Sequence, residues 1–343
     1  MALTRLPGLI DVHVHLRDPG ATQKEDFRTG SRAGVKGGFT FLIDMPNNPL
    51  PTITPERLAE KIALAGQKAL LDVGFHYGTN GYNLDTFSRI WSNPKVFGLK
   101  VYCSHTTGDL FIESKKLLED IWKAWESPKP IVVHAEGEQL ALALDLTKKY
   151  KRRIHECHIS LVKELELVRQ AKKEGVQISA GVCPHHLFLT EEDEKRLGVK
   201  GIMRPPLATQ ADQMALWDGI QNGTIDLVET DHAPHLLAEK EEGTARFGVP
   251  GLETSLGLLA KGVRDQKITE QDITRLLYSN PQRIFNIPVQ EDTFIEVDFD
   301  KTYTVGNNGY ETKCAWSPFE GWELPGLLHR VVLRKETLYP FHE

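Results

Sequence analysis

The chain has 343 residues, of which 40% are hydrophobic and 26% are charged, the balance of an ordinary soluble globular protein. Its formal net charge of −6, without any run of lysine and arginine, argues against a general nucleic-acid-binding protein. Apolar runs stay short of the roughly 18 residues that a membrane-spanning helix needs. The first residues lack the apolar segment of a signal peptide, and the four scattered cysteines form no CxxC pair. We therefore expect a cytoplasmic protein without disulfides or membrane contact.

Short apolar runs alternate with longer amphipathic segments along most of the chain. The runs are rich in Val, Ile, Leu and Phe, which is typical of parallel strands buried on both faces. They span residues 6–15, 38–46, 70–78, 96–103, 130–136, 152–159, 175–182 and 225–232. Eight such strands, each followed by a helix or a long connection, predict an α/β fold of the (β/α)8 TIM barrel type.

The segments between the runs carry helix signals. Residues 54–69 begin with Thr54 as a candidate N-cap, followed by proline at the first helical position. Residues 113–125 have helical spacing, and residues 160–175 end at Gly175, which suits a helix stop. These three helices are therefore expected between predicted strands, as a barrel requires.

The sequence changes character from about Val289 onward. Residues 291–305 and 326–334 have the alternating pattern of antiparallel strands. We therefore expect a barrel domain over residues 1–288 and a small β-rich extension over residues 289–343 that packs on the barrel.

The first predicted strand ends in "IDVHVHLRD", in which His13 and His15 are separated by one residue and Arg17 follows. Alternate side chains of a strand point to the same side. Two imidazoles at this spacing can bind one metal ion, and zinc is the usual choice for histidine and carboxylate ligands. Taken alone, the pair is more readily explained as two hydrogen-bonding histidines at a strand end.

Other predicted strands also end in polar residues. His134 ends the fifth strand, His158 ends the sixth, and Asp231 ends the eighth, with His235 just after it. Enzymes with this architecture place catalytic groups at the carboxyl ends of several strands. These residues are hard to explain by core packing, so we expect them to converge on one site.

Lys100 lies between Leu99 and Val101 in a strand that should be buried. A buried lysine is costly unless its charge is paired or lost. One explanation is an amine that reaches solvent at the strand end. The other is a neutral amine carboxylated by CO2, which burial favours and whose two oxygens could bridge two metal ions. We favour the carbamate because a two-metal site is expected around it.

Long motifs extend this pattern over nearly the whole chain. They include "PGLIDVHVHLRDPGATQKEDF", "DMPNN", "GLKVY", "VVHAE", "CPHHLFL", "DHAPH", "PGLETSL" and "WSPFEG". These motifs resemble the amidohydrolase superfamily and, more narrowly, the dihydroorotases. The form that they resemble most is the dihydroorotase domain within the animal multifunctional pyrimidine-synthesis polypeptides.

The resemblance implies a binuclear zinc centre bridged by carboxylated Lys100 and a hydroxide. The ligands of one zinc ion would be His13, His15, Lys100 and Asp231. The ligands of the second zinc ion would be Lys100, His134 and His158. We expect Asp231 to transfer the proton between the hydroxide and the leaving nitrogen. The reaction would be the reversible cyclisation of N-carbamoyl-L-aspartate to L-dihydroorotate in de novo pyrimidine biosynthesis.

The resemblance also implies residues that contact the substrate. Arg17, Asn47 and His235 would hold the substrate carboxylate. Arg204 would have a weaker substrate or loop role, and Thr106 would be the threonine with which a loop closes over the substrate. Relatives commonly dimerise, so a homodimer is expected, either free or as part of a multienzyme polypeptide.

Arg17 distinguishes this resemblance from related ones. Its planar fork suits a carboxylate, whereas hydantoinases and dihydropyrimidinases act on rings without one and resemble the chain less after the two histidines. Allantoinases usually diverge at this arginine. The alternative for Arg17 is a surface ion pair with Asp18 or Glu25.

Two positions depart from the animal pattern. Gly181 stands where animal relatives carry an acidic residue associated with an additional metal, so a third metal ion is not expected. In the polar loop 103–111, Thr106 matches but Thr107 replaces an expected aromatic residue, so loop closure should be weaker or shifted. Two alternatives stay open, an inactive scaffold domain and another cyclic amidase. The full set of ligand residues favours catalysis by a dihydroorotase.

Overall fold

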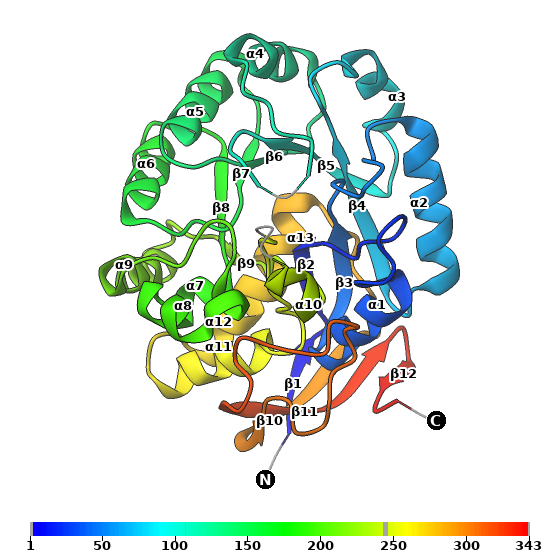
Figure 1. Cartoon of the computed structure of the whole chain (residues 1–343), viewed down its shortest axis with the longest axis vertical. Helices are drawn as coiled ribbons and strands as arrows, with labels where there is room; N and C mark the ends of the chain where they lie inside the picture. Colours follow the sequence, from blue (N-terminus) through cyan, green and yellow to red (C-terminus); the bar gives the residue numbers. More distant parts are fainter. Residues whose placement is uncertain (1–2, 107, 243–245, 342–343) are drawn as a thin grey trace.

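The structure is a computed structural model that describes residues 3–106, 108–242 and 246–341. Within these residues, eight parallel strands follow one another in chain order around a ring (Figure 1). They are β2 (Leu9–Val14), β3 (Phe39–Asp44), β4 (Asp72–Gly78), β5 (Val96–Tyr102), β6 (Ile131–His134), β7 (Ile154–Glu156), β8 (Ile178–Val182) and β9 (Leu227–Val228).

The two ends of this sheet meet through the segment that follows β9. Val14 and His232 form an isolated parallel bridge, and the backbone N–H of His15 donates to the carbonyl of His232 at 2.8 Å. The ring is therefore a nearly closed barrel, and the predicted TIM-barrel fold is confirmed.

Helices surround the barrel strands (Figure 1). The α-helices are α1 (Phe27–Lys36), α2 (Pro55–Lys68), α3 (Phe87–Ile90), α4 (Lys115–Ala124), α5 (Glu138–Tyr150), α6 (Val162–Lys173), α7 (Pro184–Phe188), α8 (Glu191–Leu197), α9 (Gln210–Gln221), α10 (Leu237–Glu241), α11 (Ser255–Arg264), α12 (Glu270–Thr274) and α13 (Asn280–Phe285). Two short 3-10 helices, η1 (Leu84–Thr86) and η2 (Gly198–Gly201), and one π-helical turn, η3 (Arg275–Ser279), accompany them. The three predicted helices are α2, α4 and α6. Thr54 caps α2 as expected, because its hydroxyl accepts from the backbone N–H of Arg57 at 3.3 Å. No helix in the described part of the chain is long and apolar enough to cross a membrane.

A separate antiparallel sheet lies beside the barrel and has the strand order β1-β10-β11-β12 (Figure 1). Its strands are β1 (Thr4–Pro7), β10 (Phe294–Thr304), β11 (Glu323–Leu333) and β12 (Glu336–Tyr339). The antiparallel strands predicted in the tail are therefore present, but β1 joins them from the start of the chain. The run 6–15 divides at Gly8, where a side-chain carbon would lie 2.3 Å from Oγ1 of Thr40.

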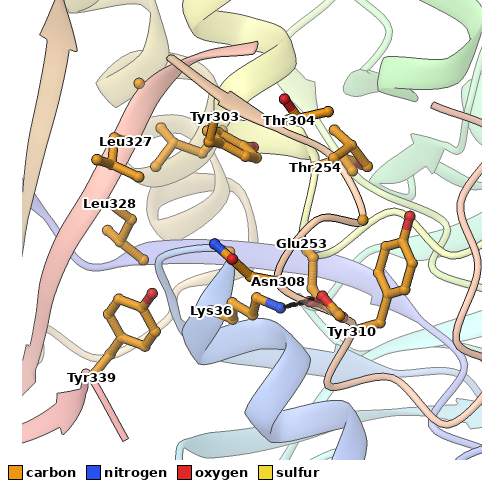
Figure 2. Close-up of a pocket in the computed structure, with 16 residues that line it drawn as sticks. Lys36, Glu253, Thr254, Tyr303, Thr304, Asn308, Tyr310, Leu327, Leu328 and Tyr339 are labelled. Atoms are coloured by element: carbon orange, nitrogen blue, oxygen red, sulfur yellow. Dashed lines mark hydrogen bonds and ion pairs between the residues drawn. The ribbon is translucent and has the colours of Figure 1, made fainter. Parts of the chain in front are cut away.

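A cavity lies where this sheet meets the barrel (Figure 2). Lys36 at the end of α1 pairs with the buried carboxylate of Glu253 at 2.9 Å. Oε1 of Glu253 also accepts from the backbone N–H groups of Glu311 and Thr312, each at 3.0 Å. Around this pair stand side chains from the second sheet, which include Tyr303, Leu327, Leu328 and Tyr339. These contacts attach the tail to the barrel.

Candidate metal centre and active site

Segments at two barrel strands bring His13, His15 and Asp231 together. His13 lies in β2, His15 follows that strand, and Asp231 follows β9. Oδ1 of Asp231 lies 3.0 Å from Nε2 of His15 and 3.3 Å from Nε2 of His13. All three residues are buried, and their ligand atoms are close enough to share one ion. Two histidines and a carboxylate are a donor set that zinc accepts.

A second pair of histidines adjoins this group. His134 ends β6 and His158 lies just beyond β7, and Nδ1 of His134 is 3.2 Å from Nε2 of His158. The rings of His158 and His13 are 5.0 Å apart between centroids. The predicted histidine ligands therefore form one continuous cluster.

Three of the predicted site residues have a left-handed backbone. The φ angles are 60° for Arg17, 36° for His158 and 44° for Asp231. Residues other than glycine adopt this region at a cost of about 1–3 kcal/mol each, and such strain concentrates at functional sites. Surrounding contacts must therefore hold these three residues in place.

Lys100 lies in β5 with its side chain fully buried, so an amine that reaches solvent is not what the structure shows. Its Nζ donates to Sγ of Cys157 at 3.1 Å and lies 4.9 Å from the ring centre of Tyr102. A thiol is a weak acceptor. Among the described residues, no carboxylate forms an ion pair with this amine. A buried amine without a counter-charge is the form that carboxylation would relieve.

Unpartnered ring nitrogens show that the site suits a cation. Among the described residues, Nδ1 of His158 is buried without a hydrogen-bond partner, and Nε2 of His134 has only Oε1 of Glu136 nearby, at 3.5 Å. Burial lowers the pKa of His15 to about 3. Burial alone would raise the pKa of Asp231, but His13 and His15 hold it below its usual range. Neutral imidazoles and an ionised carboxylate are the forms that bind metal, so these residues fit a metal centre.

Arg17 and His235 meet beside the cluster. The guanidinium of Arg17 lies 3.2 Å from Nε2 of His235 and donates through Nε to the carbonyl of Pro234 at 3.3 Å. Nζ of Lys24 lies 3.2 Å from Nδ1 of His235. Burial, with Arg17 and Lys24 nearby, lowers the pKa of His235 to about 2. The ring is therefore neutral. Lys24 pairs with Glu239 at 3.2 Å, so Arg17 supplies the positive charge at this end of the site.

The surface ion pair considered for Arg17 is not formed. Arg17 is only 8% exposed, and Asp18 pairs instead with Lys68 at 2.7 Å. Glu25 is buried and lies 3.4 Å from Nε2 of His232. The guanidinium of Arg17 is therefore available to the cavity.

One cavity joins most of the predicted residues. Its wall consists of His13, His15, Arg17, Asn47, Tyr102, Thr106, His134, His158, Arg204, Asp231, Ala233, Phe247 and Gly248. Of the predicted site residues, Lys100 and His235 do not line it. Lys100 is buried beside Tyr102, and His235 contacts Arg17 from outside the wall.

Comparison with known proteins shows the family of this chain. Residues 4–289 match the model of the amidohydrolase family. The chain belongs to this family. It is 42% identical to the multifunctional protein CAD of Squalus acanthias over 98% of its own length, but it spans only 15% of that protein. It is 36% identical to a dihydroorotase of Methanosphaera stadtmanae, covering 94% of the chain and 82% of that enzyme. Among solved structures, an L-hydantoinase (dihydropyrimidinase) from Arthrobacter aurescens matches with a TM-score of 0.93 and 25% identity, covering 98% of the chain and 85% of the hydantoinase.

The amidohydrolase site also contains residues that sequence reasoning missed. Tyr102 lines the cavity, and its hydroxyl has no hydrogen-bond partner among the described residues. It shares a strand face with Lys100 at a spacing of two, so the strand period could have indicated it. Phe247 comes from the loop after α10, where no periodic pattern pointed to it.

The remaining predicted positions are placed as follows. Oδ1 of Asn47 accepts from Nδ1 of His15 at 2.7 Å, so Asn47 contacts a metal-ligand candidate as well as the cavity. Arg204 lies 3.5 Å from Oε1 of Glu136. Thr106 lines the cavity, whereas Thr107 lies outside the described residues.

Proposed function

We propose that this amidohydrolase is a dihydroorotase, which reversibly cyclises N-carbamoyl-L-aspartate to L-dihydroorotate in pyrimidine biosynthesis. The observation that carries the proposal is the buried Arg17 at the edge of a cavity whose floor is a histidine and aspartate cluster. Dihydroorotate combines a cyclic amide with a carboxylate. Its enzyme therefore needs a metal-binding cluster for the amide and a cation such as Arg17 for the carboxylate. Dihydroorotases that match over more than nine-tenths of the chain support this substrate.

Two zinc ions would be held by the buried ligand set His13, His15, Lys100, His134, His158 and Asp231, with Lys100 carboxylated. The unpartnered nitrogens and the uncompensated amine of Lys100 support this assignment. When bound, such ions supply Lewis acidity toward the amide carbonyl. Gly181 offers no ligand, so the proposal stays at two ions.

Asp231 would move the proton. It is ionised, it is buried, and its Oδ1 lies within 3.3 Å of both His13 and His15 at the cavity wall. In ring opening it accepts a proton from the attacking water and delivers it to the leaving nitrogen, and in ring closure the transfer reverses.

Arg17 would bind the substrate carboxylate. Its guanidinium is a planar fork that can donate two parallel hydrogen bonds, and the neutral ring of His235, 3.2 Å from it, does not neutralise its charge. Asn47, Arg204 and Thr106, the other proposed substrate contacts, line the same cavity.

The assembly is also a proposal. We expect a homodimer in the cytoplasm, either free-standing or within a longer multienzyme polypeptide, because the chain resembles part of multifunctional proteins. Light scattering of the purified chain measures the dimer directly, and a monomer at micromolar concentration would contradict it.

A substrate panel tests the function. The zinc-loaded protein is given L-dihydroorotate, dihydrouracil, hydantoin and allantoin, and ring opening is followed by ultraviolet absorbance. We expect kcat/KM for dihydroorotate to exceed the others by at least about 100-fold, because a site built for a polar group discriminates against analogues that lack it. A preference for an uncharged ring would favour a hydantoinase-type amidase. No turnover by protein that holds two zinc ions would favour the scaffold alternative.

A further inference from the structure

The carboxylate of Glu229 lies beside the proposed metal centre but takes no part in the proposed reaction. Glu229 follows β9 and is fully buried. Its Oε1 accepts from the backbone N–H of His158 at 2.6 Å. Its Oε2 lies 3.2 Å from Nε2 of His155 and 3.7 Å from Nδ1 of His13. One carboxylate therefore connects residues near the ends of β2 and β7.

The contact with His158 acts on a strained position. His158 has a φ angle of 36°, a conformation that its surroundings must hold. A short hydrogen bond from its own N–H to a buried carboxylate is a strong restraint, because one partner is charged. This restraint fixes the backbone from which the His158 ring reaches His134 and His13.

The contact with His13 acts on the ring itself. Nε2 of His13 faces Asp231, and Nδ1 faces Glu229. When Nε2 binds a metal ion, the ring proton must lie on Nδ1, where the carboxylate of Glu229 stabilises it. At 3.7 Å the effect on His13 is electrostatic rather than a hydrogen bond.

Gly181 provides the space that Glu229 fills. Gly181 lies in β8, the strand next to β9, and a side-chain carbon there would lie 2.4 Å from Oε1 of Glu229. Behind the carboxylate, His155 is held in turn, because its Nδ1 lies 2.9 Å from Oγ of Ser179. Glycine at 181 and glutamate at 229 therefore form a matched pair.

We propose that Glu229 is a positioning residue that presents His13 and His158 to a metal ion, and that Gly181 is required to accommodate it. The inference rests on the proposed metal centre. Glu229 does not contact the substrate in this proposal. Replacing Glu229 should therefore lower metal affinity directly and lower turnover only as a consequence.

The zinc affinity of the 343-residue chain tests the proposal. Metal-free wild type, Glu229→Gln and Gly181→Ala are titrated with zinc against a chromogenic chelator, and their unfolding temperatures are measured without metal. Asp226→Asn is the matched control. Asp226 is a carboxylate near the other end of β9 that accepts from the N–H of Ala180 at 2.8 Å and from Lys172 at 2.6 Å.

We expect Glu229→Gln and Gly181→Ala each to lower zinc affinity by about 10- to 100-fold, the usual effect of losing an outer partner of a metal-bound histidine. Asp226→Asn should leave the affinity unchanged, whatever it does to stability.

The two proposals fail in different ways. Wild type that binds no zinc would overturn the proposed metal centre. Wild type that binds zinc, with unchanged affinity in both variants, would overturn the role of Glu229. If Glu229→Gln does not fold, Gly181→Ala decides alone, because it displaces the carboxylate without removing it.

Discussion

Oδ1 of Asn47 lies 2.7 Å from Nδ1 of His15, and Nε2 of the same ring lies 3.0 Å from Asp231. The amide therefore orients the imidazole so that its other nitrogen faces the proposed metal centre. Asn47 lies in the loop after β3, and His15, the proposed ligand that it contacts, follows β2.

Replacing Asn47 by alanine should lower zinc affinity by about 10- to 100-fold, because the ring of His15 loses the partner that orients it. Asn47→Asp keeps an acceptor at the same place and should bind zinc nearly as well as the wild type. Competition with a chelator measures both variants. Equal affinity of Asn47→Ala and the wild type would contradict the orienting role.

Arg17→Gln should raise KM for L-dihydroorotate and lower kcat/KM by about 10- to 150-fold, because hydrogen bonds to a charged group contribute about 1.5–3 kcal/mol. Zinc content should stay at the wild-type level, since Arg17 is not a ligand. Steady-state kinetics and metal analysis of the same preparations check both points. An unchanged KM would show that the carboxylate binds elsewhere.

Lys61→Met should destabilise the fold by about 3–5 kcal/mol, because it leaves a buried charge without its partner. Nζ of Lys61 lies 2.7 Å from Oδ2 of Asp44, and both side chains are only 1% exposed. Lys116→Met is the control, because Lys116 pairs with Asp120 while its side chain is 74% exposed, and such pairs contribute less than about 1 kcal/mol. Urea unfolding compares them, and equal effects would contradict the prediction.

Asp26→Ala should cost about 1 kcal/mol at neutral pH, the usual effect of losing an N-cap. Asp26 caps α1 by accepting from the N–H groups of Arg28 and Thr29, each at 2.9 Å. Partial burial opposes ionisation, but Lys313 and Thr29 hold the pKa of Asp26 below its ordinary 3.8.

The sign of the pH dependence follows from that lowered pKa. The unfolded chain takes up the proton first as pH falls, so the stabilisation by Asp26 is complete above its ordinary pKa of 3.8 and is lost below it. The difference in unfolding free energy between wild type and Asp26→Ala should therefore shrink in acid. A difference that is constant from neutral pH down to strong acid would contradict this account.

The sequence predicted the barrel because buried parallel strands leave long apolar runs, and it predicted the histidine cluster because each histidine lies near a strand end. It did not predict that Gly8 divides the first run, since that depends on Thr40 in the neighbouring strand. Nor did it predict that the carboxylate of Glu229 packs against Gly181. That contact depends on the register in which Gly181 lies opposite Leu227, and register is a long-range property.

The turnover of L-dihydroorotate by the zinc-loaded protein, followed by ultraviolet absorbance with Lys100→Ala as the partner variant, is the first measurement to make. We expect the wild type to turn over and to carry the additional mass of one CO2, and Lys100→Ala to lose both turnover and bound zinc. No turnover by wild type that holds two zinc ions would contradict the proposed function. Undiminished turnover by Lys100→Ala would contradict the carbamate-bridged centre.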